Sequence, residues 1–285
     1  MSNIVYLNGK MVHLNWATVS VMDYGFLYGF SLFETMRSYR GRVFRMERHL
    51  ERLVRSAEIL GINVPIIDWK GMVMDTLHAN KLEDARIRIT ISAGEGGSVP
   101  DPASCEKPTV LILASAYTPF PAEVYEKGFR AIFSSIHRNS QSPLSGIKSA
   151  NYLESLLARQ EARKAATDEA VCLNEKGLLA EASMSNIFLV TSDILKTPGL
   201  ASGILPGITR ETVIELAAQS GIEILEQDIN PDELVLAEEA FLTNSLMEVM
   251  PLTTVGDKPV GSGRPGEITL RLMSLYKELV ATETA

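Results

Sequence analysis

Residues 145–152 read Ser145-Gly-Ile-Lys148-Ser-Ala-Asn-Tyr152, and they lead into an apolar segment with helical periodicity at about Ala150–Ala165. Lys148 is therefore flanked by small residues and lies just before a predicted helix N-terminus, which carries partial positive charge. That field favours the neutral amine, the form in which a lysine makes a Schiff base. A solvated surface lysine is the alternative that the same residues allow.

Three further segments supply complementary chemistry. Leu205-Pro-Gly-Ile208-Thr209 opens an amphipathic helix, whose first N–H groups and hydroxyl suit an anion, with helix capping by Thr209 as the alternative. Glu181 is a lone acid among small residues, and if buried it needs a cation such as a protonated ring nitrogen. Thr243-Asn244-Ser245 offers hydroxyl donors. A lysine, a phosphate cup and an acid for a ring nitrogen together make a pyridoxal phosphate (PLP) site.

Composition narrows the class of protein. The chain has 285 residues, 46% hydrophobic and 22% charged, with a net charge of −8, which gives no support for nucleic-acid binding. Seven arginines lie between residues 37 and 55. They form either a solvated face or a binding site for an anionic ligand. We expect a cytoplasmic protein without membrane spans, because no signal sequence or run of roughly 18 apolar residues occurs. Two cysteines and four scattered histidines predict no metal site.

Hydrophobic periodicity predicts an α+β fold in two domains, with many hairpins and no regular βαβ alternation. We expect residues 1–118 to form a small N-terminal domain, residues 119–125 a linker, and residues 126–285 a larger domain that carries the lysine. The predicted strands are Ile4–Leu7, Met11–Leu14, Ala17–Val21, Leu32–Tyr39, Arg86–Ser92, Thr109–Ala114, Phe129–Ile136, Glu169–Leu173, Leu178–Val190, Ile222–Glu226 and Glu239–Leu242. The predicted helices are Met46–Leu60, Trp69–Ala79, Ala150–Ala165, one that begins near Gly207, and Glu267–Val280.

Six strings, in order along the chain, resemble the class IV PLP enzymes of fold type IV, which include branched-chain and D-amino-acid aminotransferases and aminodeoxychorismate lyase. They are Tyr28–Tyr39, His49-Leu-Glu-Arg52-Leu, Lys148-Ser-Ala-Asn-Tyr152, Glu181–Phe188, Pro206-Gly-Ile-Thr209-Arg and Thr243–Pro251. The resemblance implies a small N-terminal and a larger C-terminal α/β domain, with PLP as the cofactor. It also implies a homodimer, in which the cofactor cleft lies between the domains and is completed by the neighbouring subunit.

By this resemblance, Lys148 forms the Schiff base and transfers the proton, and Glu181 pairs with the pyridine nitrogen. Tyr152 matches a tyrosine near the ring oxygen, although it is one residue closer to the lysine than in branched-chain enzymes. The positions that match phosphate ligands are Arg52, Ile208, Thr209 and Ser245. The positions expected at the substrate are Tyr28, Phe33, Arg37, Arg88 and Asn244, of which Arg37 and Arg88 are candidates for binding a carboxylate.

The same strings leave the reaction open. Phe33-Glu-Thr35-Met-Arg37 stands where branched-chain enzymes read Phe-Glu-Gly-Ile-Arg, and this departure and the lysine–tyrosine spacing argue against that subgroup. Thr35 and Asn244 resemble the residues that the lyase has at these positions, where Thr35 would act as a catalytic hydroxyl. The segment Gly94–Pro102, in contrast, lacks the Arg-x-His motif with which D-aminotransferases bind the substrate carboxylate.

We expect an aminotransferase that uses a D- or branched-chain amino acid and a 2-oxo acid, with aminodeoxychorismate lyase as the alternative. A non-catalytic binding protein on the same fold is a third possibility. The presence of both Lys148 and Glu181 argues against it, because a decayed site should lose one of them.

Overall fold

The computed structural model describes residues 3–285, and backbone contacts divide them into two units. The first unit contains residues 3–118, Ile147–Asn151 and Glu283–Ala285, and the second contains Pro119–Gly146 and Tyr152–Thr282. A purely linear division therefore misplaces Lys148, because its segment hydrogen-bonds to a strand of the first unit. The expected linker also contains part of a helix, α4 (Ala122–Lys127).

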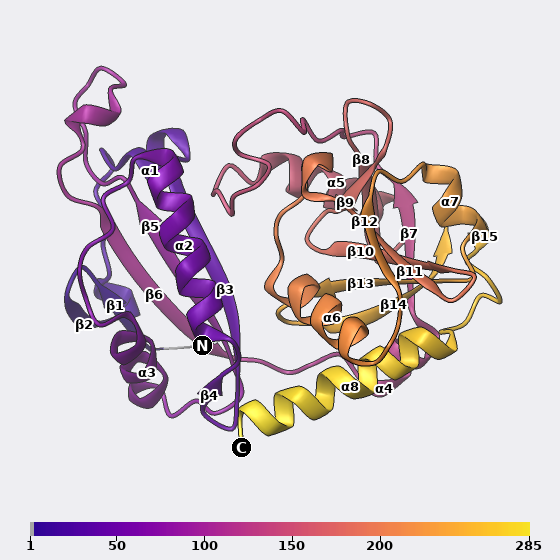
Figure 1. Ribbon diagram of the computed structural model, residues 1–285. Helices are drawn as coiled ribbons and strands as arrows, with labels where there is room; N and C mark the ends of the chain where they lie inside the picture. Colours follow the sequence, from indigo (N-terminus) through magenta and orange to yellow (C-terminus); the bar gives the residue numbers. More distant parts are fainter. Residues whose placement is uncertain (1–2) are drawn as a thin grey trace. The chain divides into compact units, whose positions relative to one another are not determined.

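The first unit is a six-stranded antiparallel sheet with two helices on one face (Figure 1). The strand order is β2-β1-β6-β5-β3-β4. The strands are β1 (Ile4–Leu7), β2 (Lys10–His13), β3 (Ser31–Tyr39), β4 (Arg42–Val43), β5 (Ala85–Ser92) and β6 (Thr109–Ala116). The helices are α2 (Met46–Leu60), which packs on β3, and α3 (Trp69–Ala79), which packs on β1 and β6, with short turns at η1 (Leu14–Trp16), α1 (Tyr24–Tyr28) and η2 (Pro102–Ser104).

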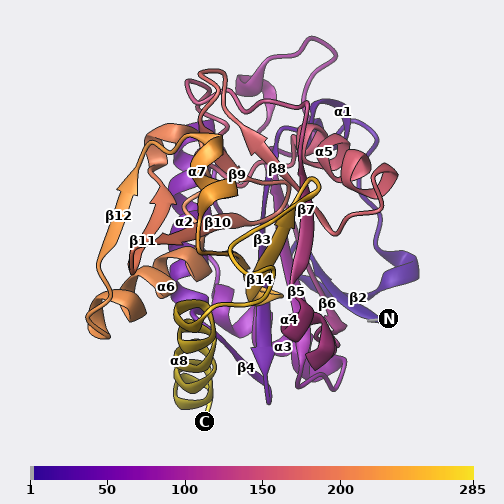
Figure 2. The same cartoon turned by 90° about the vertical axis from the view of Figure 1, so that its right-hand side faces the viewer.

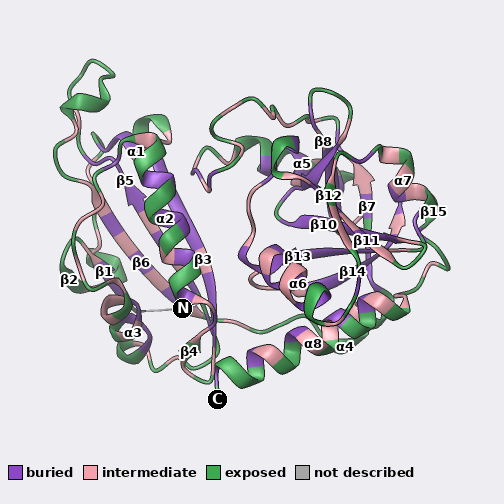
Figure 3. Ribbon diagram, in the orientation of Figure 1, coloured by how far each residue is buried: buried purple, intermediate pink, exposed green. Residues whose placement is uncertain are grey.

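Helix α2 has the bounds that the sequence predicts, because an apolar stripe and a stop signal agree. Leu53 and Ala57 are buried against the sheet, and Gly61 ends the helix at φ 67°, a left-handed conformation that glycine adopts without strain. The same buried side also carries His49 and Arg52. Figure 3 shows this alternation of buried and exposed positions along the helix.

The predicted strand at Ala17–Val21 is wrong. The segment alternates apolar and polar residues, but no strand within residues 3–285 pairs with it, and a strand needs a neighbour for its backbone groups. Instead the chain turns into α1, a short helix in which the Gly25 N–H donates to the side chain of the N-cap residue, Asp23 (2.7 Å). The predicted hairpin at Asn8-Gly9 is confirmed, with positive φ at both residues.

The second unit is built on a nine-stranded mixed sheet in the order β12-β11-β10-β13-β14-β7-β8-β9, with β15 paired to β14. The strands are β7 (Phe129–Phe133), β8 (Glu169–Leu173), β9 (Leu179–Ala182), β10 (Asn186–Thr191), β11 (Ile194–Pro198), β12 (Ile224–Gln227), β13 (Glu239–Asn244), β14 (Glu248–Val255) and β15 (Lys258–Pro259). The other elements are α5 (Leu153–Lys164), η3 (Leu200–Ser202), α6 (Ile208–Gln219), α7 (Pro231–Leu236) and α8 (Glu267–Glu283). Strands β11 and β12 lie side by side at one edge (Figure 2).

One difference in this unit bears on the site. The sequence predicts a single return strand over Leu178–Val190, but the structure divides it into β9 and β10 around Ser183–Ser185. This turn allows both Glu181, at the end of β9, and Asn186, at the start of β10, to lie beside one another. No helix within residues 3–285 is long and apolar enough to cross a membrane.

Candidate active site

Lys148 lies against the first residues of β3. The Phe33 N–H donates to the Lys148 carbonyl (3.0 Å), and the Ala150 N–H donates to the Ser31 carbonyl (2.8 Å). The Lys148 Nζ lies 4.6 Å from the centre of the Phe33 ring, and the Arg88 guanidinium carbon lies 3.8 Å from the same centre. Backbone pairing thus holds the lysine beside an aromatic ring that a second cation also contacts.

One face of β3 gathers several of the predicted substrate residues. Phe33, Thr35 and Arg37 alternate along the strand and share this face, and Thr35 lies directly opposite Arg88 on β5. Farther along, the Arg37 guanidinium lies 4.3 Å from the Tyr39 ring centre and 4.9 Å from that of Tyr117. Tyr28, in contrast, is on α1, where it is 46% exposed and packs edge-on against Tyr24.

The opposite face of β3 carries a buried ionic group between the strand and α2. Glu34 is fully buried, and its two oxygens accept hydrogen bonds from Arg52 Nε (2.8 Å) and Nη2 (2.7 Å). The His49 Nδ1 lies 2.7 Å from Glu34 Oε2. Arg52, which matches a phosphate position in the family, is therefore buried and oriented by Glu34. This bidentate geometry fixes the plane of the guanidinium.

The protonation states of this group follow from its contacts. Burial disfavours the charge on Glu34, but Arg52 and the hydrogen bonds from His49 and Arg52 outweigh burial and lower its pKa to about 2. An ionised carboxylate only accepts hydrogen bonds, so His49 Nδ1 must carry the proton. Burial lowers the pKa of His49, and the charges of Arg52 and Lys148 act in the same direction against the opposing effect of Glu34.

Glu34→Gln is expected to destabilise the protein at pH 7 and to flatten its acid unfolding curve. The wild-type carboxylate has a folded pKa below its unfolded value of 4.5, so its stabilisation is present above pH 4.5 and is lost as pH falls towards 2. The contribution is about 3 kcal/mol. Urea unfolding at pH 7, 5 and 3 measures it, with Glu47→Gln, which breaks an exposed pair with Lys70, as the matched control. Equal pH profiles for wild type and Glu34→Gln would contradict the assignment.

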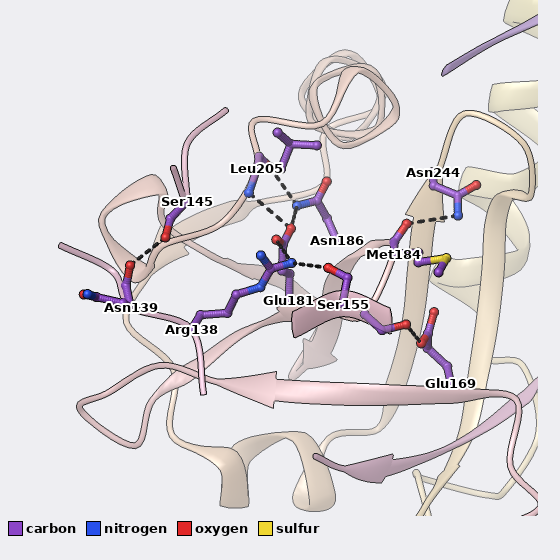
Figure 4. Close-up of polar contacts among 11 residues, drawn as sticks. Arg138, Asn139, Ser145, Ser155, Glu169, Glu181, Met184, Asn186, Leu205 and Asn244 are labelled. Atoms are coloured by element: carbon purple, nitrogen blue, oxygen red, sulfur yellow. Dashed lines mark hydrogen bonds and ion pairs between the residues drawn. The ribbon is translucent and has the colours of Figure 1, made fainter. Parts of the chain in front are cut away.

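In the second unit, Glu181 is buried although β9 is the last strand of its sheet. Its Oε1 lies 2.8 Å from Arg138 Nη2, and its Oε2 accepts from the Leu205 N–H (3.1 Å) and from Asn186 Nδ2 (3.1 Å) (Figure 4). The cation expected for a buried Glu181 is therefore supplied in part by the protein itself. No sequence motif marks Arg138, because it meets Glu181 only through the fold.

Tyr152 directly precedes α5 and is close enough to Glu181 to interact with its charge. Burial raises the pKa of the Tyr152 phenol to about 12, and Glu181 adds to the rise. The phenol therefore keeps its proton at neutral pH and remains a hydrogen-bond donor.

The start of α6 has the features of an anion site. Its N-cap is Gly207, so Thr209 lies within the first turn, and the interpretation of Thr209 as the helix cap is wrong. The first N–H groups of a helix have no partner inside it, and they carry partial positive charge. Ile208 and Thr209 are buried in this turn. A Cβ at Gly207 would lie 2.0 Å from Asn186 Oδ1, so any side chain there would displace the Asn186 amide.

Asn244 and Ser245 follow in the turn after β13. The Asn244 side chain is used within the turn: its Oδ1 accepts from Leu246 N and Met247 N (both 2.9 Å), and its Nδ2 donates to the Met184 carbonyl (3.2 Å). These bonds give Asn244 a structural function, and its contact with substrate stays a prediction. Next to it, the buried Thr243 Oγ1 has no hydrogen-bond partner within residues 3–285. A buried hydroxyl of this kind is available to a bound polar group.

Each unit, taken by itself, supplies groups of the kind that PLP requires. The first unit has the Lys148 amine. The second has a buried carboxylate that accepts from three donors, and a helix start led by a glycine, with no side chain in the way of an anion. Within the described chain, no group of three or more His, Cys, Asp or Glu side chains is placed to hold a metal ion. The fold and these side chains therefore define a fold type IV PLP enzyme.

Comparisons with known proteins agree. The model of the amino-transferase class IV family matches residues 31–255. A putative branched-chain-amino-acid aminotransferase of Methanocaldococcus jannaschii is 40% identical over 278 residues, 96% of each chain. Aminodeoxychorismate lyase of Bacillus subtilis is 34% identical over 96% of this chain and 94% of its own. The crystal structure of Escherichia coli branched-chain amino acid aminotransferase gives a TM-score of 0.94 at 34% identity, over 100% of this chain and 97% of that one.

The chain belongs to the class IV aminotransferase family, whose members depend on PLP. Its class of activity is that of a transaminase, and the substrates of this class are amino acids and 2-oxo acids. When bound, PLP supplies an electron sink for the electron pair of a broken Cα–H bond.

Proposed function

We propose that the chain transfers the amino group of a branched-chain amino acid to a 2-oxo acid. The observation that supports this proposal most directly is the Phe33 ring beside the Lys148 amine. The aliphatic side chain of a branched-chain substrate would gain free energy from contact with this apolar ring. Arg88, on the same ring, is suited to pair with a substrate carboxylate. Relatives named branched-chain aminotransferases match nearly the whole chain, and this outweighs the two departures at Thr35 and at the lysine–tyrosine spacing.

Each residue has a defined task in this scheme. Lys148 Nζ would take the proton from the Cα of the amino donor. In the second half of the reaction it would deliver a proton to the Cα of the 2-oxo acid that receives the amino group. Glu181 would pair with the pyridine nitrogen and favour its protonated form, and Arg138 holds that carboxylate in place. The first turn of α6, with Ile208 and Thr209, binds the phosphate, together with Ser245 and Arg52. Tyr152 donates its hydroxyl hydrogen near the ring oxygen.

Two other reactions remain as candidates. An amino transfer from a D-amino acid would use the same residues. The two donors differ in their configuration at Cα, and so in the side from which the Cα–H bond must face Lys148. Aminodeoxychorismate lyase is favoured by Thr35, whose hydroxyl lies on the same face as Phe33 and opposite Arg88, and by the Bacillus subtilis relative. Both reactions begin when a proton is removed by the lysine, so the substrates must separate them.

A substrate panel combined with Thr35→Val decides between these reactions. We expect purified protein to transfer the amino group of L-leucine to 2-oxoglutarate faster than that of D-alanine or (R)-phenylethylamine, and to release no pyruvate from aminodeoxychorismate. Thr35→Val keeps the β-branched shape, so the amino transfer should change by only a few-fold. Pyruvate release that falls by about 10²-fold in this variant would instead assign the lyase reaction.

We also propose that the chain forms a homodimer. Between Met11 and Tyr28, the first unit exposes large apolar side chains, among them Trp16 (78%), Val21 (70%) and Phe26 (73%). Exposed apolar surface of this kind marks interaction sites, and a second copy is the partner that the family resemblance implies. Light scattering should give twice the 31.3 kDa of one chain. A single-chain mass at micromolar concentration would contradict the dimer.

A further inference from the structure

We propose that Asn186 is a positioning residue, which holds the Glu181 carboxylate and the start of α6 in a fixed relation. The inference rests on the proposed function, in which Glu181 meets the pyridine nitrogen and α6 binds the phosphate. Asn186 is the first residue of β10, pairs with Thr243 of β13, and is 4% exposed. It is thus anchored in the sheet rather than in either of the segments that it contacts.

The side-chain amide of Asn186 closes a ring of hydrogen bonds. Its Nδ2 donates to Glu181 Oε2 (3.1 Å) and to the Leu205 carbonyl (2.9 Å), and the Leu205 N–H donates to the same Glu181 oxygen (3.1 Å) (Figure 4). A carboxylate and a carbonyl are both acceptors, so only the NH₂ end of the amide satisfies this pair. The orientation of Asn186 is therefore fixed by chemistry as well as by geometry.

The other end of the amide contacts the loop that leads into α6. Asn186 Oδ1 lies so close to Gly207 that a Cβ on this residue would be 2.0 Å from the oxygen. Gly207 has φ −72°, a value that any residue adopts, so the contact with Asn186, and not the backbone conformation, is what disfavours a side chain here. Asn186 thereby touches the loop at Leu205 and again at Gly207, directly before Ile208 and Thr209.

These contacts set the separation between two cofactor anchors. PLP is a rigid ring with a short phosphate arm, so its nitrogen and its phosphate must meet their partners at one fixed distance. Where one amide holds both partners, a ligand that carries both groups benefits from their spacing. A ligand that carries only one of the groups does not. This difference separates a positioning function from a merely structural one.

Binding to the cofactor-free, full-length protein tests the inference with three probes: PLP, pyridoxal, which lacks the phosphate, and inorganic phosphate. For Asn186→Ala we expect PLP binding to weaken by roughly tenfold to a hundredfold. Pyridoxal and phosphate, each of which uses one anchor, should bind within a few-fold of wild type. Equal losses for all three probes, or unchanged PLP binding, would overturn the positioning function.

Two further variants keep the test informative. Asn174→Ala is the matched control, because Asn174 is a buried asparagine of the same unit that makes three comparable bonds, to Lys176 N, Leu178 N and the Ser202 carbonyl. It should not change the ratio of PLP to pyridoxal affinity. Gly207→Ala disturbs the same contact from the loop side and should lower this ratio. It also replaces Asn186→Ala if that variant does not fold.

The double variant adds an independent criterion. The new Cβ of Gly207→Ala clashes with Asn186, so Gly207→Ala should cost less PLP affinity in the Asn186→Ala background than in wild type. If the two substitutions lower PLP affinity additively, the inference that Gly207→Ala acts through Asn186 is wrong. Wild-type protein that binds no PLP would instead contradict the proposed function, and the two failures are thus distinct.

Discussion

Lys148→Ala protein is expected to bind PLP and to lose amino transfer by about 10²–10⁴-fold or more. The substitution keeps the main-chain bonds between residues 148–150 and β3, so the local fold should persist. It removes the amine beside the Phe33 ring, which is the group that the proposed function assigns to proton transfer. Steady-state rates and cofactor content measured on the same preparation check both parts of the expectation.

Borohydride reduction provides the direct measurement for this lysine. Wild-type protein should be yellow, should lose its visible absorption band on reduction, and should carry the reduced cofactor on the peptide that contains Lys148. The matched control is Lys176→Ala, which removes an exposed lysine of the second unit and should behave as wild type. An adduct on a different lysine, or none at all, would refute the assignment of Lys148.

Glu181→Gln is expected to reduce turnover by about 10²–10³-fold, because the neutral amide no longer favours a protonated ring nitrogen when charge develops during the reaction. The structure adds a second effect. Arg138 would lose the carboxylate 2.8 Å from its Nη2, and breaking a buried ion pair is destabilising in itself. We therefore expect a lower Tm as well as a lower kcat.

Arg138→Gln separates these two effects. It breaks the same ion pair but keeps the carboxylate, so its Tm should fall about as much as that of Glu181→Gln, and its kcat should fall much less. If both variants lose the same kcat, the catalytic loss follows from the broken pair. If Glu181→Gln keeps wild-type turnover, Glu181 is a structural acid and its assignment to the ring nitrogen is wrong.

Sequence alone predicts those parts of the fold in which local signals agree. Helix α2 follows from its apolar stripe and from Gly61, and the first hairpin from Asn8-Gly9, since both signals act over a few residues. The segment Ala17–Val21 shows the converse. Its alternating pattern suits a strand, but only a neighbouring strand stabilises one, and the pairing of strands is not written in the local sequence.

The same distinction holds for the candidate site. Lys148 and Glu181 stand in recognisable strings, and the structure gives both a defined surrounding. Arg138 and the donors to Glu34 could not be predicted in this way, because each pair forms between elements that are distant in sequence. His49 and Arg52 lie one turn apart in a string that the sequence does mark, but their common partner on β3 becomes visible only in the fold.

The segment Ile147–Asn151 has a consequence for the order in which the protein is made. It covers the backbone edge at the start of β3, through the bonds of Phe33 and Ser31, yet the ribosome adds it long after the rest of the first sheet. An uncovered strand edge invites pairing with other chains. The nascent first unit therefore stays incomplete until residue 151 has emerged, and Lys148 enters its place in the same event that closes this edge.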